Sequence, residues 1–228
     1  MLNGTTINSE QPIGHNFQPY TDNGGNMVAV AGKDFVIVAS DTRLSEGYSI
    51  QTRDRVKFFK LTDSTVLGST GCWCDVLAFV KVLNARIKLY NYDHRKSMST
   101  NATSQLVSTM LYSKRFFPYY ISNIVAGLDE NGAGAVYSYD PVGSFDRYTS
   151  QAVGSSSPLI QPLLDNQIEK KNQANVEKLD LTPDFVKRVV KDAFISAAER
   201  DMYCGDSAVI QLITKDGITE ERIQLRKD

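Results

Sequence analysis

The sequence predicts one domain of mixed α and β structure, on the strength of three observations. Apolar runs occur in pairs joined by short polar turns, as in the hairpin formed by residues 27–31, Gly32-Lys33-Asp34 and residues 35–39. Elsewhere, apolar residues recur at intervals of three and four, which is typical of helices with one buried face. The length of 228 residues is enough for one such domain with a sizeable core.

The first hairpin is followed by short strands and then by a helix. Strands are expected at residues 49–53, 56–61 and 65–71, where apolar and β-branched residues gather. The helix follows with Asp75 in its first turn, where a negative charge suits the helix dipole. Its expected buried face consists of Val76, Phe79, Val80, Leu83, Ile87 and Tyr90.

The middle of the chain continues with a second helix, over about residues 102–113, and then with more strands. A hairpin is expected from residues 119–127 and 135–140, since Asp129-Glu130-Asn131-Gly132 between them is typical of a turn. A third strand is expected over about residues 148–153.

Two more helices and a final hairpin complete the order. Ser155-Ser156-Ser157 are expected to cap a helix that begins near Pro158, with Pro162 bending it or delaying its start. The last helix starts at Pro183, and a hairpin over residues 209–225 turns at Lys215-Asp216-Gly217. The buried stripe of that helix is expected to be Phe185, Val186, Val189, Val190, Ala193, Phe194 and Ala197.

Composition argues against several classes of function. The net charge of −1 offers no electrostatic basis for binding nucleic acid or an anionic membrane. No apolar run approaches the roughly 20 residues that span a bilayer. Three cysteines and two histidines are too few for a disulfide framework, and Cys72-Trp73-Cys74 lacks the further ligands that a zinc site needs. We therefore expect no metal and no cofactor.

Residues 1–23 form a polar arm that is propeptide-like, and residues 24–228 form the domain. Pro12, Gly14 and Pro19 interrupt any regular element in the arm. The arm has no apolar core of signal-peptide type, so we expect a protein of the cytoplasm and nucleus.

The segment after the first hairpin contains the residues that most suggest a function. Asp41-Thr42-Arg43 ends a buried strand, and Lys57 follows 14 residues after Arg43. Charges in such a place need partners, because an unpaired interior charge is very costly.

These residues resemble the start of a proteasome β subunit, a member of the N-terminal nucleophile hydrolase family. The resemblance extends over nearly the whole chain, and the aromatic run at 115–120 makes it most similar to the non-catalytic type at the sixth ring position. Its other parts are residues 40–44, 134–144, 161–167, 196–201 and 225–228. The resemblance implies the α+β fold of that family, a four-layer αββα sandwich.

The resemblance also implies that the reacting atom is missing. Active relatives begin, after cleavage behind a glycine, with a threonine placed sixteen positions before the aspartate that matches Asp41; here that position is Gly25. Lys57 and Asp201 match the accessory lysine and second aspartate of the family. One of Ser155, Ser156 and Ser157 matches one accessory serine, and Cys204 stands in place of the other. We expect no catalytic residue and no self-cleavage between Gly24 and Gly25.

The function implied is that of a non-catalytic structural subunit of the 20S proteasome core particle in ubiquitin-dependent protein degradation. Its partners would be neighbouring β subunits of the same ring, the α ring and the opposite β ring. Asp41, Arg43, Lys57 and Asp201 would then form a buried polar network that holds strand ends together. The alternative is an active amidase or protease with an unconventional nucleophile, Cys204 or Ser40. Gly4-Thr5-Thr6 is a poor nucleophile site, and residues 14–17 are a plausible trimming point.

Overall fold

The structure is a computed structural model that describes residues 18–174 and 180–227. Most of the predicted arm, including Gly4-Thr5-Thr6 and the predicted trimming point at residues 14–17, lies outside the described residues. Residues 18–25 have neither helical nor strand structure and lead directly into the first strand.

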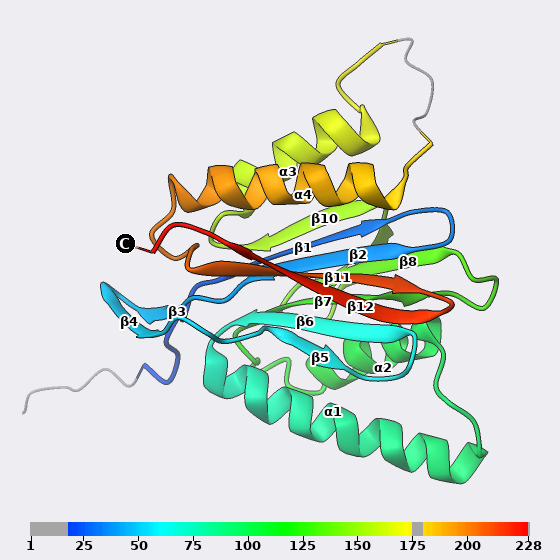
Figure 1. Cartoon of the computed structure of the whole chain (residues 1–228). Coiled ribbons are helices and arrows are strands. Elements are labelled where there is room, and N and C mark those ends of the chain that lie inside the picture. The colour runs from blue at the N-terminus through cyan, green and yellow to red at the C-terminus, as the bar shows by residue number, and fades with distance from the viewer. Residues whose placement is uncertain (1–17, 175–179, 228) are drawn as a thin grey trace, which may run out of the picture.

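Two five-stranded antiparallel sheets lie face to face at the centre of the molecule (Figure 1). The first sheet has the order β10-β1-β2-β11-β12, and the second has the order β5-β6-β7-β8-β9. The strands of the first sheet are β1 (Asn26–Ala31), β2 (Val36–Asp41), β10 (Ser150–Gly154), β11 (Ser207–Thr214) and β12 (Gly217–Gln224). Those of the second are β5 (Phe58–Lys60), β6 (Thr65–Gly71), β7 (Ile121–Leu128), β8 (Gly134–Tyr139) and β9 (Phe145–Tyr148). A small separate sheet pairs β3 (Leu44–Glu46) with β4 (Ser49–Thr52).

Helices cover the outer face of each sheet (Figure 1). The second sheet is covered by α1 (Trp73–His94) and α2 (Thr100–Tyr112). The first sheet is covered by α3 (Ser157–Leu164), a following π-helical turn η1 (Asp165–Glu169), and α4 (Pro183–Ala198). No helix within residues 18–174 and 180–227 is both long enough and apolar enough to cross a membrane.

The alternation of side chains along β2 explains the layers. Ile37 points toward α3 and α4, whereas Val36 and Val38 point into the core between the two sheets. A strand that is buried on both faces reads as a continuous apolar run, as β1 and β2 do. The four-layer αββα sandwich that the resemblance implied is confirmed.

Two local predictions were wrong. The strand expected over residues 148–153 is two strands, because the chain leaves the second sheet after β9, which pairs with β8, and enters the first sheet as β10, which pairs with β1. A run of β-forming residues does not reveal such a change of sheet.

The serines before α3 do not cap it as predicted. Ser156 is the N-cap residue, but its side chain makes no capping hydrogen bond, because its hydroxyl donates to Asp201 instead. Thr182 does cap α4, by accepting a hydrogen bond from the backbone N–H of Phe185.

Candidate functional site

Gly25 lies directly before β1 in a backbone conformation that favours glycine. Its φ is +96°, and a Cβ placed on it would overlap Cε of Lys57. The flanking main chain is held in place, since the Gly24 carbonyl accepts from Thr70 Oγ1 at 2.5 Å and the Gly25 carbonyl accepts from the Ser155 N–H at 3.3 Å. The position is therefore shaped around the absence of a side chain.

Lys57 fills the space next to Gly25 and is fully buried. Its Nζ forms an ion pair with Asp41 Oδ1 at 3.1 Å and donates to the carbonyl oxygens of Asp41 and Arg43, each at 2.8 Å. An ammonium group has three donors, and these three acceptors use all of them.

Asp41 connects the lysine to the start of β1. Its Oδ1 also accepts from the backbone N–H of Asn26 at 2.7 Å, and its Oδ2 accepts from that of Arg43 at 3.2 Å. Burial raises the pKa of Asp41, and the Lys57 charge together with these hydrogen bonds offsets part of that rise. The Asp41–Lys57 pair fixes the end of β2 against the start of β1.

Arg43 points away from this pair, toward the end of the chain. Its Nε pairs with Asp206 Oδ2 at 2.9 Å, and its Nη1 donates to the Met202 carbonyl at 2.8 Å. Arg53 pairs with the other oxygen of Asp206 at 2.5 Å. Burial acts to raise the pKa of Asp206, but the two guanidinium groups outweigh it and hold that pKa below its ordinary value.

Asp201 lies apart from the Asp41–Lys57 pair and is joined to it through Asn26. Its Oδ2 accepts from the hydroxyls of Ser155, at 2.6 Å, and Ser156. The Asn26 side-chain amide donates to Ser155 Oγ at 3.2 Å, while its backbone N–H binds Asp41. Burial acts to raise the pKa of Asp201, but the serine hydroxyls and the Tyr203 N–H outweigh it and lower that pKa. The predicted accessory residues are thus one hydrogen-bonded chain, with Asn26 as its link.

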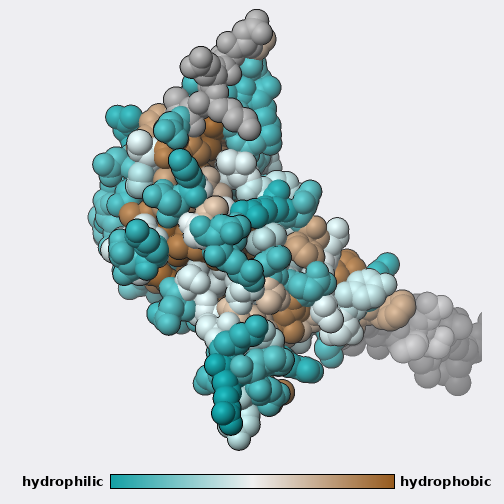
Figure 2. Space-filling model, turned by 90° about the vertical axis from the view of Figure 1, so that its right-hand side faces the viewer, coloured by the Kyte–Doolittle hydropathy of each residue, from teal (hydrophilic) through white to brown (hydrophobic). Residues whose placement is uncertain are grey.

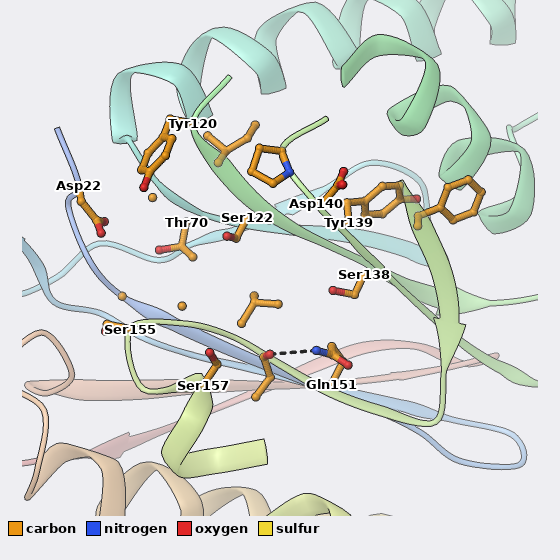
Figure 3. Close-up of a pocket in the computed structure, with 18 of the residues that line it drawn as sticks. Asp22, Thr70, Tyr120, Ser122, Ser138, Tyr139, Asp140, Gln151, Ser155 and Ser157 are labelled. Carbon is orange, nitrogen blue, oxygen red and sulfur yellow. Dashed lines mark hydrogen bonds between the residues drawn. The ribbon is translucent and has the colours of Figure 1, made fainter. Parts of the chain in front are cut away.

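A cavity of about 880 Å³ opens beside Gly25, between the two sheets. Figure 3 shows Thr70, Ser122 and Ser138 of the second sheet on one wall, and Gln151, Ser155 and Ser157 on the other. Asp22, Asp140 and Asp146 add carboxylates to the lining. The cavity is lined mainly by polar groups. At its edge lies the position that the family resemblance assigns to the nucleophile, and Gly25 occupies it.

Comparison with known proteins identifies this arrangement. The family model described as proteasome subunit matches residues 21–213. The chain belongs to the proteasome subunit family. A Danio rerio protein named proteasome subunit beta type-1 is 56% identical over 217 residues, which cover 95% of this chain and 92% of that protein. The Drosophila melanogaster protein of the same name is 50% identical, over 93% of this chain and 91% of that protein. Proteasome subunit beta type-6 of Saccharomyces cerevisiae is 43% identical, over 96% and 95%.

Membership of the proteasome subunit family implies assembly with other proteasome subunits in a core particle. The relatives match over nearly their full lengths, so the resemblance stated from the sequence is confirmed.

The two unconventional nucleophiles are buried. Cys204 is 1% exposed, and burial together with the carboxylates of Asp41 and Asp201 raises the pKa of its thiol. Ser40 is fully buried, and its hydroxyl has no hydrogen-bond partner among the described residues. Both groups are therefore withdrawn from the solvent, from which a substrate would approach.

Three residues that organise this site were not predicted from the sequence. Asn26 follows Gly25 at the start of a buried strand, where a polar side chain must find partners, and that position is the signal that points to it. Asp206 is the acidic partner that the buried Arg43 needs, but no pattern in the sequence distinguishes it from the other acidic residues. Asn23 belongs to the segment assigned to the arm, yet it is buried.

The two cysteines of Cys72-Trp73-Cys74 lie in different surroundings, because Cys72 is buried and Cys74 is exposed.

Proposed function

We propose that this chain is a non-catalytic, structural β subunit of the 20S proteasome core particle, of the type that its relatives' names call beta type-1. The observation that carries the proposal is Gly25, which has no hydroxyl and whose neighbourhood leaves no room for a side chain. An N-terminal nucleophile needs both a hydroxyl and a freed amino group as its base. Gly25 supplies neither while the chain continues through Gly24.

The charged residues around Gly25 serve the fold in this proposal. The three N–H donors of the Lys57 ammonium group all bind oxygen atoms of Asp41 and Arg43, so none is directed at a reacting atom. Asp201 is likewise committed to Ser155, Ser156 and Tyr203. The network joins β1, β2, the residues just before α3 and the turn that follows α4.

The outer faces of the molecule support a role as one subunit among several. Large apolar side chains are exposed on α1, including Leu89 at 55% and Tyr92 at 83%, and on α4, where Ile195 is 50% exposed. Figure 2 shows apolar patches between hydrophilic residues on one side of the molecule. We assign these surfaces to neighbouring β subunits, the α ring and the opposite β ring. Three free cysteines fit a reducing compartment, and we assign the chain to the cytoplasm and nucleus.

Native mass spectrometry of the endogenously tagged chain, with N-terminal peptide mapping of the same sample, tests the assembly. We expect recovery in a particle of four stacked seven-membered rings, with no cleavage between Gly24 and Gly25. Recovery as a 25.3 kDa monomer would contradict the structural role.

A covalent probe directed at hydroxyl and thiol groups tests the absence of catalysis in the same particle. We expect it to label active neighbours and, on this chain, at most the exposed Cys74. Activity-dependent labelling of Cys204 or Ser40 would establish a catalytic subunit instead.

A further inference from the structure

Two Asn-Gly dipeptides lie within residues 18–174 and 180–227, at Asn23-Gly24 and at Asn131-Gly132. An asparagine before a glycine is chemically labile, because glycine has no Cβ and its main-chain nitrogen can approach the carboxamide carbon of the preceding residue. Whether the nitrogen reaches that carbon depends on how the fold holds the asparagine side chain and the glycine N–H. The two dipeptides share this chemistry and differ in their surroundings.

Asn23 is held by both its side chain and its main chain, and only 6% of it is exposed. Its Nδ2 donates to the Ser45 carbonyl at 3.1 Å, and its Oδ1 accepts from the Trp73 N–H at 2.8 Å. Its main chain bridges β3 and β6, since its carbonyl accepts from the Ser45 N–H and its N–H donates to the carbonyl of Gly71. Turning the carboxamide toward the main chain would break both side-chain bonds.

The nitrogen that would attack Asn23 is held as well. The Gly24 N–H donates to the Asp22 carboxylate at 2.9 Å, and the Gly24 carbonyl accepts from Thr70 Oγ1 at 2.5 Å. A Cβ placed on Gly24 would lie 2.9 Å from Cβ of Tyr203, so the backbone is closely packed there. Attack at Asn23 therefore requires a large opening of the fold, in which many of these contacts break together.

Asn131 lies in the turn between β7 and β8 and is exposed. Its carboxamide makes no hydrogen bond with any residue that the structure describes. Gly132 has a φ of +78°, and a Cβ placed on it would meet nothing within 4 Å. The carboxamide and the glycine that follows it are thus both surrounded by open space.

The turn is held by hydrogen bonds to Asp129. The Gly132 N–H donates to the Asp129 carbonyl at 2.9 Å, and Asp129 Oδ1 accepts from the N–H groups of Asn131, at 2.9 Å, and Ala133, at 3.0 Å. These bonds must open before the Gly132 nitrogen can attack. They join close neighbours within one turn, so they open without disturbing the core.

We propose that Asn131 is a site of spontaneous deamidation in the folded protein. The Gly132 main-chain nitrogen bonds to Cγ of Asn131 and loses its proton to solvent, while the carboxamide nitrogen leaves as ammonia. Water then opens the cyclic imide at either of its carbonyl carbons, which gives aspartate or isoaspartate. Water is consumed and ammonia is released, so the step needs no other reactant.

The products change the turn in two ways. Either product adds a carboxylate beside Asp129 and Glu130. Isoaspartate also lengthens the main chain directly before Gly132, whose N–H binds the Asp129 carbonyl. We expect this end of the β7–β8 hairpin to loosen as the protein ages. The inference does not depend on the proposed function, because it concerns the chemistry of this turn alone.

Peptide mapping by mass spectrometry tests the site on intact core particles that have been aged at mildly alkaline pH. We expect deamidated Asn131 to accumulate at least about tenfold faster than deamidated Asn23, because Asn23 reacts only after a larger opening of the fold. The same full-length chain unfolded in urea is the control, and in it the two dipeptides should react at similar rates. Equal rates in the folded particles, or no product at Asn131 while the unfolded chain reacts, would overturn the proposal.

Asn131→Gln is the matched variant, because it keeps a carboxamide on an exposed turn. Attack on glutamine would have to close a larger ring, so we expect the product at residue 131 to fall below detection while assembly is unchanged. Chromatographic separation of the aspartate and isoaspartate peptides reports how the imide opens. Undiminished deamidation of the same peptide in Asn131→Gln would place the reaction at another residue and contradict the assignment.

Discussion

Gly25 and Lys57 are matched to each other at the scale of single residues. The positive φ of Gly25 and the absence of a Cβ allow the lysine stem to lie against the backbone, where its ammonium group reaches three acceptors. Leaving a buried ammonium group without these partners would cost several kcal/mol. The glycine thus allows this placement of Lys57, and it has no hydroxyl that could react.

The first prediction compares Gly25→Ala with the control Gly132→Ala. Both glycines have positive φ, but a Cβ at Gly132 meets nothing within 4 Å, whereas one at Gly25 overlaps Lys57. We expect Gly132→Ala to lower the free energy of unfolding by about 1–2 kcal/mol, and Gly25→Ala to lower it clearly further. Urea unfolding of the purified chains measures the difference. Equal losses of unfolding free energy would show that the Lys57 side chain moves aside at no cost.

The second prediction concerns Gly25→Thr, which restores a hydroxyl at the nucleophile position. We expect no self-cleavage after Gly24 and no added peptidase activity, because Lys57 occupies the space of the new side chain. N-terminal peptide mapping and peptidase assays of assembled particles measure this. A mature chain that begins at residue 25 would contradict it.

The third prediction concerns pH and Asp201. Its pKa is lowered in the folded state from 3.8, so the unfolded chain binds a proton more readily and stability falls as pH drops through and below about 4. Asp201→Asn removes this contribution, so we expect a lower stability at neutral pH and a shallower loss between about pH 4 and 2. Urea unfolding across this range checks the slope, and parallel curves for variant and wild type would refute the assignment.

At the scale of elements, the helices were predictable because each buries one face on a sheet. The stripe predicted for α4 is buried at Val186, Val189, Val190, Ala193, Phe194 and Ala197, with Phe185 partly buried. The predicted face of α1 is buried in the same way, with Tyr90 partly so. Strands were harder to delimit, as β9 and β10 illustrate, because the sheet that a strand joins depends on distant residues.

The fourth prediction uses two neighbours on α4. Phe194 is fully buried against the first sheet, and Ile195 is half-exposed on the opposite face. We expect Phe194→Ala to cost about 3–5 kcal/mol of stability and Ile195→Ala less than about 1 kcal/mol. Urea unfolding of both variants measures this, and similar losses would show that the buried face is assigned wrongly.

At the scale of the whole molecule, both helical layers present apolar side chains outward. Leu77, Leu89 and Tyr92 are exposed on α1, and Leu159 and Ile195 are exposed on α3 and α4. Exposed apolar groups gathered on helices mark surfaces that contact other proteins. The molecule is therefore suited to contacts on both sides of its sandwich.

The fifth prediction follows for α1. Leu89→Glu adds a charge to this surface without touching the core, so we expect a folded chain that enters core particles several-fold less than wild type. The control, Lys215→Glu, changes an exposed turn of the final hairpin. Affinity purification of tagged chains measures incorporation into core particles. Equal recovery of both variants in core particles would show that Leu89 of α1 does not contact a neighbouring subunit.

Residue type and local spacing were enough to predict the apolar strands and the amphipathic helices. The resemblance supplied the layering, the missing hydroxyl at Gly25 and the accessory residues Asp41, Lys57 and Asp201. The folded chain alone reveals that Asn26 links those residues, that Asp206 neutralises Arg43, and that Asn23 bridges β3 and β6. Each of these contacts joins residues far apart in the chain, and hydrogen-bond partners at such separations are chosen by the packing of layers rather than by sequence neighbours.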